Sequence, residues 1–365
     1  MRIGVPEWHG MIDERALHPP AGCTYHSIGY SDTMLKRLFP SGIKGGFFSS
    51  PDGGCDLIEA IVLPVVTDQR WIYSVANFAE PMSFTFRGIP LPKLVRRAIL
   101  NGIFLKDNLR SIVLWSEAAK ESMIDYAGMS NPSVLKKAKV VYPAIARAPD
   151  RIKPPDSPLI LFSGQFFRKG GMHVVDAFYE LLGHFPDLKL RICSDLEKDF
   201  VLTDQRLRGF YLDKILNNDS ISVGRLPRAQ LLAEILPKTS VYVLPSYEEA
   251  FGFALLEALA FGVPIVSSDV FAIPEIVAPN KSGFLLPFVE NVNSRDIVDG
   301  YGIRPLSADV HKAISSWTST AIARILTSRV AQFEMSEFSQ SIARSRFSFA
   351  QHNAQMSEIY NTALS

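Results

Sequence analysis

Two glutamates and two basic residues in the second half of the chain have the types and spacing to do chemistry. Glu249 and Glu257 bracket an apolar run, EAFGFALLE, that follows the β-branched stretch VYVLP. Glu257 has Phe, Leu and Ala neighbours on nearly every face of a predicted helix, and a carboxylate there is costly unless it is paired or hydrogen-bonded. A buried structural pair and a ligand hydroxyl would both satisfy it. Arg168 and Lys169 precede two glycines, and cations there can neutralise a departing diphosphate or simply lie in a solvated turn.

The spacing of the two glutamates argues against one kind of reaction. Eight helical positions cover about 12 Å, whereas the two carboxylates of a glycosidase lie roughly 5–9.5 Å apart. Glu249 and Glu257 are therefore better placed to hold two ends of an extended ligand than to share one bond. Glu248, beside Glu249, is expected to stabilise the positive end of the following helix.

Around these residues the second half alternates strands and helices. Such alternation predicts a parallel, Rossmann-like sheet covered on both faces, with ligands bound at the carboxyl ends of its strands. The predicted strands are Leu159–Ser163, Leu188–Cys193, Ser220–Val223, Val241–Pro245 and Val263–Ser267, and the predicted helices are Gly171–Leu182 and Phe251–Phe261.

The first half is less regular. A loop is predicted over Ser41–Gly54, and the proline-rich stretch Ala146–Pro158 is expected to link two domains. The predicted strands are Arg2–Val5, Asp56–Val62, Arg70–Val75 and Ser111–Trp115, and the predicted helices are Pro90–Lys106, Glu117–Ala127 and Phe347–Leu364.

Composition narrows the class of protein. The 365 residues suggest two domains, and 47% hydrophobic content argues against disorder. With 38 basic and 37 acidic side chains, no general attraction to nucleic acid is expected. Cys23, Cys55 and Cys193 form no CxxC, which suggests a reducing compartment and no zinc module. No apolar run reaches the ~18 residues of a membrane span, so we expect a cytoplasmic protein, at most peripheral at the inner membrane face.

The stretch from Glu249 to Glu257, followed by Gly262, Pro264 and Asp269, closely resembles the EX7E signature of the retaining glycosyltransferases of family GT4, the group 1 glycosyl transferases. The resemblance runs from about Leu159 to Pro287 and is weak before Ser111. It implies the α/β GT-B fold, in which two Rossmann-like domains face each other across a cleft. Residues 1–150 would form the acceptor-binding domain, 151–340 the nucleotide-sugar domain, and 341–365 a helix crossing back to the first domain.

The resemblance also implies roles for single residues. Glu249 would contact hydroxyls of the donor sugar, and Glu257 would accept hydrogen bonds from the nucleotide ribose. Lys169, with Arg168 as helper, would receive the departing diphosphate. The remaining nucleotide-sugar-binding residues would be Gly164, Gln165, Arg225, Phe251, Gly252 and Phe253, with Arg225 stacking on the base.

Two positions depart from the family pattern. Gln165 stands where many members carry arginine, so either Arg168 supplies that charge or diphosphate binding is weaker. Phe271 stands where many members have glycine, which narrows the approach to the donor. On the acceptor side, His9, Asn77 and Glu80 are candidates. The basic stretch 87–106 could touch a membrane that carries a lipid-linked acceptor, or could be an ordinary amphipathic helix.

The predicted function is a metal-independent retaining transfer of a hexosyl group from a UDP- or GDP-linked sugar to a saccharide or glycolipid hydroxyl, as in polysaccharide biosynthesis. No cofactor is expected, because the nucleotide sugar is a co-substrate and the chain has no Asp-x-Asp for a divalent metal. Two alternatives stay open: a GT-B epimerase or phosphorylase, and a non-catalytic binding protein with this fold. The sugar, the base, the acceptor and the oligomeric state are not determined.

Overall fold

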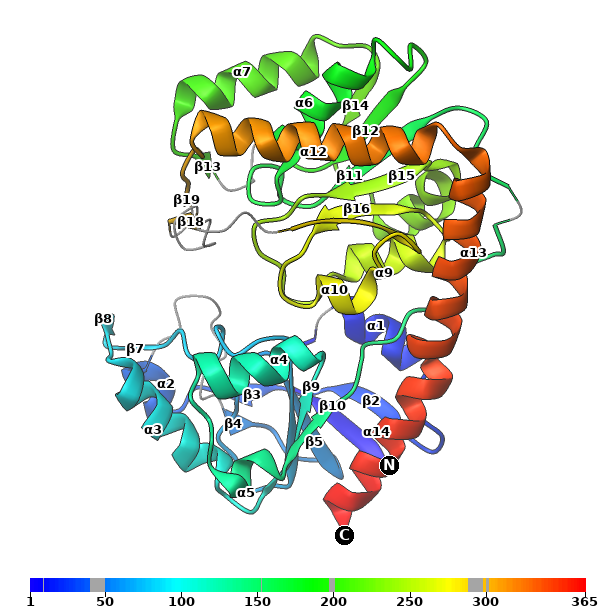
Figure 1. The fold of residues 1–365 in the computed structure, drawn as a ribbon. Helices are drawn as coiled ribbons and strands as arrows, with labels where there is room; N and C mark the ends of the chain where they lie inside the picture. The colour runs from blue at the N-terminus through cyan, green and yellow to red at the C-terminus, as the bar shows by residue number, and fades with distance from the viewer. Residues whose placement is uncertain (9, 40–49, 152, 197–200, 288–297, 300–301) are drawn as a thin grey trace. The chain divides into compact units, whose positions relative to one another are not determined.

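The computed structural model describes residues 1–8, 10–39, 50–151, 153–196, 201–287, 298–299 and 302–365. The chain divides into two compact units (Figure 1). Unit 1 comprises Met1–Ala146 and Arg346–Ser365, and unit 2 comprises Arg147–Ser345. The first division falls inside the proline-rich stretch predicted as a linker, and the chain returns to unit 1 near its C-terminus.

Unit 1 is built on a six-stranded parallel sheet with the order β10-β9-β6-β5-β1-β2. Every residue of the two central strands is buried, and apart from Glu59 and Ser74 these residues are apolar or aromatic rather than alternating with polar ones. The strands are β1 (Arg2–Val5), β2 (Thr24–Ser27), β5 (Leu57–Ile61), β6 (Trp71–Val75), β9 (Leu109–Leu114) and β10 (Ala138–Val140).

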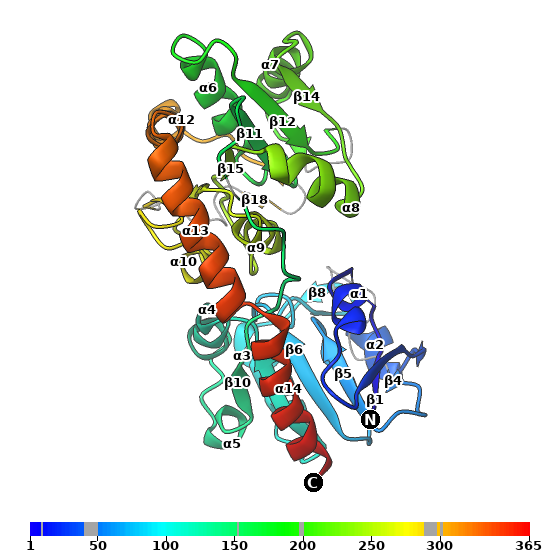
Figure 2. The same cartoon turned by 90° about the vertical axis from the view of Figure 1, so that its right-hand side faces the viewer.

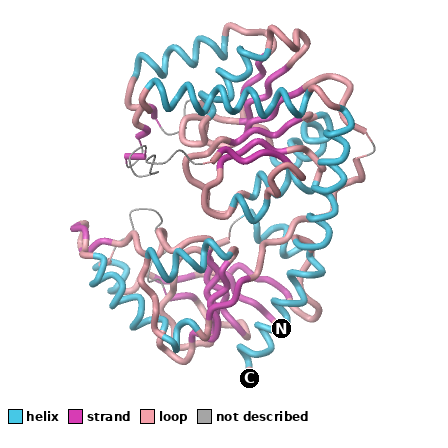
Figure 3. Tube along the Cα trace, in the orientation of Figure 1, coloured by secondary structure: helices cyan, strands magenta, loops and turns pink. Residues whose placement is uncertain are grey.

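Helices flank this sheet, and two short hairpins lie outside it (Figure 3). The helices are α1 (Gly10–Leu17), α2 (Met34–Leu38), α3 (Lys93–Phe104), α4 (Glu117–Glu121), a π-helical turn (Ser122–Tyr126), α5 (Pro132–Leu135) and α14 (Phe349–Leu364). The hairpins pair β3 (Tyr30–Ser31) with β4 (Ser50–Pro51) and β7 (Thr85–Phe86) with β8 (Ile89–Pro90).

Helix α14 lies against this sheet (Figure 2), and a buried charge cluster holds it there. The carboxylate of Glu59 on β5 accepts hydrogen bonds from both Nη atoms of Arg15 (2.9 and 3.0 Å), from Ser74 (2.6 Å) and from the Tyr360 hydroxyl of α14 (2.6 Å). Burial alone would raise the pKa of Glu59, but these partners hold it below its ordinary value. The carboxylate is thus fully satisfied, and we interpret it as structural.

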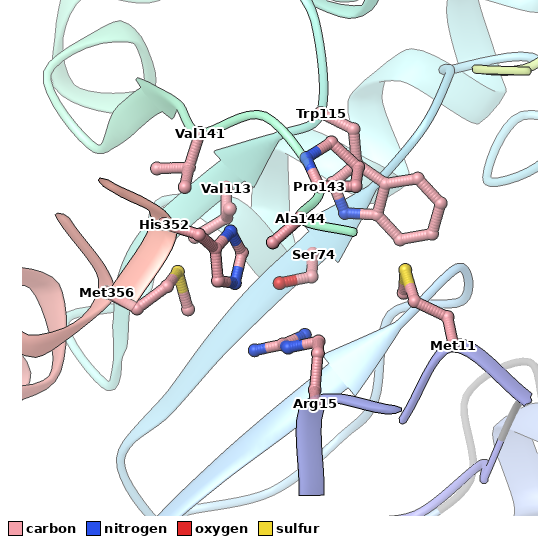
Figure 4. Close-up of a pocket in the computed structure, with 10 residues that line it drawn as sticks. All are labelled: Met11, Arg15, Ser74, Val113, Trp115, Val141, Pro143, Ala144, His352 and Met356. Atoms are coloured by element: carbon pink, nitrogen blue, oxygen red, sulfur yellow. The ribbon is translucent and has the colours of Figure 1, made fainter. Parts of the chain in front are cut away.

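A small pocket lies beside this cluster (Figure 4). Arg15 from α1, Ser74 from β6 and His352 from α14 line it together with apolar side chains. His352 is buried, and a hydrogen bond of 2.8 Å joins its Nδ1 to the Tyr142 carbonyl. The Nε2 atom of His352 is buried without a hydrogen-bond partner, so protonating this ring inside the fold is unfavourable.

Unit 2 has a second six-stranded parallel sheet, with the order β14-β12-β11-β15-β16-β17. Numbered along the chain, these strands lie in the order 3-2-1-4-5-6, which is the doubly wound Rossmann arrangement. The strands are β11 (Leu159–Ser163), β12 (Lys189–Cys193), β14 (Ile221–Val223), β15 (Val241–Leu244), β16 (Ile265–Ser268) and β17 (Gly283–Leu286). The sequence-predicted fold class of two Rossmann-like domains is confirmed.

Among the helices of unit 2, α6 packs against α12, and α9 packs against β15 and β16. They are α6 (Gly171–Leu181), α7 (Gln205–Leu216), α8 (Arg228–Gln230), α9 (Phe253–Ala260), α10 (Ile273–Ile276), α12 (Ala308–Leu326) and α13 (Arg329–Arg346). A π-helical turn (Leu231–Ile235) and a 3₁₀ turn (Leu236–Lys238) follow α8, and β13 (Val201–Leu202), β18 (Val298–Asp299) and β19 (Gly302–Ile303) form a small separate sheet.

Several predicted boundaries were wrong, for local reasons. Helix α9 begins at Phe253, not Phe251, because its N-cap Gly252 has φ +106°, which ends helical geometry there. Helix α3 begins at Lys93 after Pro92, not at Pro90, which pairs in the β7–β8 hairpin. In the loop predicted over 41–54, Ser50–Pro51 is strand β4, and 41–49 lie outside the described residues. Among the described helices, none is long and apolar enough to cross a membrane.

Two buried histidines predict how stability depends on pH. Burial lowers the pKa of His352 to about 4 and that of His173 in α6 to about 3. The unfolded chain protonates both near pH 6.5, so unfolding takes up protons below that pH. We expect the free energy of unfolding to fall by about 1.4 kcal/mol per pH unit for each histidine as the pH drops from about 6.5 towards these values.

Denaturant unfolding at pH 5 to 7.5 measures this dependence. In the His352→Gln variant the slope of unfolding free energy against pH should be smaller, because unfolding takes up about one proton fewer. A slope equal to that of the unchanged chain would show that His352 does not stay neutral in the folded state.

Candidate active site

The predicted site residues of unit 2 gather where its strand order reverses. Strands β11 and β15 are neighbours in the sheet, but the chain runs away from them in opposite directions. The loops after two such strands leave a crevice at the carboxyl edge, where doubly wound sheets bind ligands. The loop after β11 carries Gly164 to Lys169, and the loop after β15 carries Glu248 and Glu249.

Gly170 brings these two loops into direct contact. It caps the N-terminus of α6 with φ +76°, and a Cβ placed on it would lie 2.2 Å from the carbonyl oxygen of Pro245. Only glycine allows both this backbone conformation and this approach. The glycine pair is apparent in the sequence, but its packing partner is not.

Lys169 joins the two loops electrostatically. Its ammonium donates to the Glu248 carbonyl (2.7 Å) and to Oε2 of Glu249 (3.0 Å). Both side chains are largely buried, so each charge compensates the other where water screens them little. The structure therefore brings together the acid and the cation that the sequence analysis singled out.

Arg168 makes a parallel contact one position earlier. Its guanidinium pairs with the carboxylate of Glu248, and its Nη1 donates to Oε1 of Gln165 (3.2 Å). Gln165 stands where many family members carry arginine, and in this chain it holds the Arg168 side chain in the same loop. The expectation that Glu248 stabilises a helix start was wrong, because α9 begins five residues later and the Glu248 carboxylate pairs with Arg168.

A buried histidine fixes the loop that carries the glutamates. Hydrogen bonds join His173 Nε2 to the Tyr247 hydroxyl (2.7 Å) and His173 Nδ1 to Ser315 of α12 (3.0 Å). Because the imidazole is fully buried and used at both nitrogens, it holds Tyr247 in place one residue before Glu248. Sequence reasoning missed this pair, and its only signal is a histidine on the apolar first turn of α6.

Glu257 has a cationic partner that the sequence analysis missed as well. Arg228, at the start of α8, donates from Nε to Oε1 of Glu257 at 2.5 Å. Glu257 is buried, whereas the Arg228 side chain is 47% exposed, so the pair links the interior to the surface. The two residues are 29 positions apart, and no local pattern connects them. The predicted eight-position helical spacing from Glu249 was wrong, because α9 begins only at Phe253.

The other predicted residues of unit 2 lie nearby in the chain. Arg225 is exposed in the loop after β14, which Arg191 holds by donating to the Gly224 carbonyl (2.8 Å). Phe271 has φ +49°, a conformation that glycine adopts without strain. Phe251 and Gly252 precede α9, and Phe253 opens it.

The acceptor-side candidates of unit 1 are not brought together into a site by the described residues. His9 lies outside the described residues. Oδ1 of Asn77 accepts from the backbone N–H groups of Ala79 (2.9 Å) and Glu80 (3.2 Å), so this side chain shapes its own turn. Neither Asn77 nor Glu80 lines the pocket beside His352. Within the described ranges, no three His, Cys, Asp or Glu side chains come together as a possible metal site.

Comparison with known proteins agrees with this geometry. Residues 147–300 match the family model described as "Glycosyl transferases group 1". In this part the chain is similar to the group 1 glycosyl transferases, and the fold of the chain is that of the GT-B glycosyltransferases. The GT4-like resemblance carried by the sequence is thereby confirmed.

Individual relatives cover parts of the chain. Alpha-maltose-1-phosphate synthase of Mycolicibacterium smegmatis is 29% identical over 37% of this chain and 34% of its own length. D-inositol 3-phosphate glycosyltransferase of Mycobacteroides abscessus is 33% identical over 37% of this chain and 34% of its own. The chain therefore matches about a third of each. The crystal structure of Anabaena Alr3699/HepE in complex with UDP and glucose aligns over 99% of this chain and 91% of that chain, with a TM-score of 0.58 and 14% identity, which shows the fold.

Gly170 provides a test of the loop contact by stability alone. Gly170→Ala should lower the free energy of unfolding by roughly 2–5 kcal/mol, because its Cβ meets the Pro245 carbonyl and its φ is left-handed. Gly209→Ala, in the interior of α7 with open space around it, is the control and should raise stability by about 0.5–1 kcal/mol. Equal effects of the two substitutions would contradict the close packing.

Proposed function

We propose that this protein is a retaining glycosyltransferase that moves a hexosyl group from a nucleoside diphosphate sugar to the hydroxyl of a saccharide or glycolipid. The observation that carries the proposal is the pairing of Lys169 with Glu249 across the two loops at the sheet's switch point. A cation for a diphosphate and an acid for sugar hydroxyls then lie within one hydrogen bond of each other.

Donor binding follows from these groups. An ammonium has three N–H donors, and Lys169 directs two of them to Glu248 and Glu249. The third suits a phosphate oxygen. Glu249 would accept hydrogen bonds from the sugar, and the backbone amides of Phe251, Gly252 and Phe253 would add donors near the phosphates.

The nucleoside end would be held by Glu257 and the residues around it. A ribose diol can donate to the carboxylate, and the Arg228 contact fixes the direction in which that carboxylate points. Arg225, exposed in the preceding loop, would stack on the base.

In the reaction itself, the bond between the anomeric carbon and the diphosphate oxygen breaks, and its electron pair leaves with the diphosphate. The acceptor oxygen attacks the same face of an oxocarbenium-like sugar, and its proton passes to the departing phosphate oxygen. Lys169 and Arg168 stabilise the charge that develops on the diphosphate. Because these side chains supply positive charge, we propose that the reaction needs no divalent metal and no protein base.

The comparisons support this class of donor. Two relatives are named as a glycosyltransferase and as a sugar phosphate synthase, and a structure of the same fold was obtained with UDP and glucose. We therefore propose UDP-linked sugars first and GDP-linked sugars second. Unit 1 would supply the acceptor site, as the resemblance implies.

Transfer from a panel of nucleotide sugars tests the function directly. Purified protein should release nucleoside diphosphate, slowly to water and faster with an acceptor, at equal rates with and without EDTA. Lys169→Ala should lower kcat by about 10²–10³, as loss of one charge-stabilising donor does. Glu180→Gln, an exposed carboxylate on α6, is the control and should leave kcat unchanged. No release from any donor would contradict the proposal.

Glu257 can be tested separately by binding. Glu257→Gln should weaken binding of the nucleoside diphosphate about tenfold, because the amide accepts the ribose diol less well and loses its pairing with Arg228. Calorimetric titration with UDP and with GDP measures the affinity, and thermal unfolding checks that the fold is kept. Unchanged affinity for both nucleotides would refute the ribose assignment while leaving the transfer reaction open.

A further inference from the structure

A basic and apolar surface lies on unit 1, away from the buried clusters. It is formed by α2, the β7–β8 hairpin and the first turn of α3, and we call it the hairpin surface. Six large apolar side chains on these elements are exposed: Met34, Leu35, Phe86, Ile89, Leu94 and Val95. In the described part of unit 2, only Phe210, Leu216 and Val330 are large, apolar and exposed.

The three elements of the hairpin surface are neighbours in space, although residues 39–84 separate α2 from the hairpin in the sequence (Figure 1). The backbone N–H of Arg87, in the hairpin turn, donates to the Leu38 carbonyl at the end of α2 (2.8 Å). The rings of Phe39 and Phe86 lie 5.4 Å apart. Only Leu91 and Pro92 separate β8 from α3. The exposed apolar side chains therefore belong to one continuous part of unit 1.

The degree of exposure is high for side chains of this kind. Met34 is 76% exposed, Leu94 66% and Ile89 65%. Each would gain by transfer out of water, since burying such a side chain is favourable in proportion to its area. A group of them on adjoining elements marks an interaction surface, whereas single ones do not.

The charge of the surface is mostly positive. Between Pro81 and Lys106 the sequence has no acid, and it has Arg87, Lys93, Arg96, Arg97 and Lys106. Helix α2 adds Lys36, which is paired with Asp32, and the exposed Arg37. Arg96 donates to the Met82 carbonyl, Lys93 lies over the Tyr126 ring and Arg87 lies over the Phe86 ring. Arg37 and Arg87 are exposed, and we choose them as the cations for an outside partner.

Arg87 has a backbone conformation that is unusual for a residue other than glycine. The β7–β8 hairpin has a two-residue turn, Arg87-Gly88, with φ of +48° and +83°. Turns of this type favour Asn or Gly at the first position, because a longer side chain is strained there. The strained residue places a guanidinium at the tip of the hairpin, between the exposed Phe86 and Ile89.

We propose that the hairpin surface docks this protein onto an anionic lipid bilayer. The apolar side chains would enter the headgroup region, and Arg37 and Arg87 would contact lipid phosphates. A nucleic acid would use the cations but leave the apolar side chains in water, so a bilayer fits both features. The inference does not depend on the proposed transfer reaction, although a lipid-linked acceptor would suit it.

Vesicle binding by the full chain tests this inference without any sugar donor. Sedimentation with vesicles of phosphatidylcholine containing about a third phosphatidylglycerol should recover the protein, and vesicles of phosphatidylcholine alone should recover much less. The double substitution Ile89→Glu with Leu94→Glu should lower the partition coefficient at least tenfold. Leu216→Glu with Val330→Glu is the matched control on unit 2, at 66% and 69% exposure, and should leave it unchanged.

The charge contribution is tested in the same assay. Arg37→Gln and Arg87→Gln should each lower binding about fivefold at low salt, and the difference should shrink as salt screens the charges. Arg206→Gln, exposed on α7, is the control. Absence of binding by the unchanged chain to anionic vesicles, or equal losses in the surface and control variants, would overturn the proposal. Equal thermal unfolding midpoints would show that the variants are folded.

Discussion

The site of unit 2 depends on one contact, that of the Lys169 ammonium with the loop after β15. This side chain reaches both the Glu248 carbonyl and the Glu249 carboxylate. It can do so because Gly170, the next residue, lies directly against Pro245. The His173–Tyr247 hydrogen bond holds the same loop from α6. Two segments 80 positions apart are thereby held at one edge of the sheet.

Charge compensation explains why the acids can be where they are. A buried carboxylate without a partner would be strongly destabilising, and each glutamate of the site has a cation: Glu249 has Lys169, and Glu257 has Arg228. The open question from the sequence was whether Glu257 forms a structural pair or contacts a ligand. The pair exists, and the contact of Glu257 with a ribose belongs to the proposed function.

Unit 1 uses the same chemistry for a different purpose. Glu59, Arg15 and Tyr360 form a fully buried cluster, and every oxygen of that carboxylate is occupied by protein donors. The Glu59 carboxylate links the C-terminal helix to β5, and both of its oxygens already accept hydrogen bonds from the protein. On the hairpin surface, by contrast, exposed cations lie among exposed apolar side chains, which suits attachment rather than catalysis.

The sequence alone predicted the fold class and most strands of both sheets, and it singled out the segments 164–169 and 249–257, because apolar runs, glycines and a family motif are local signals. It missed the short strands β2 and β10 and the edge strand β17. It could not determine partners across the sheet. Glu248 with Arg168, Glu257 with Arg228 and His173 with Tyr247 join residues 29 to 80 positions apart. Those contacts depend on the order of strands in the sheet, which decides the loops that meet at its edge. Strand order arises from the packing of the whole unit, and no short stretch of sequence contains it.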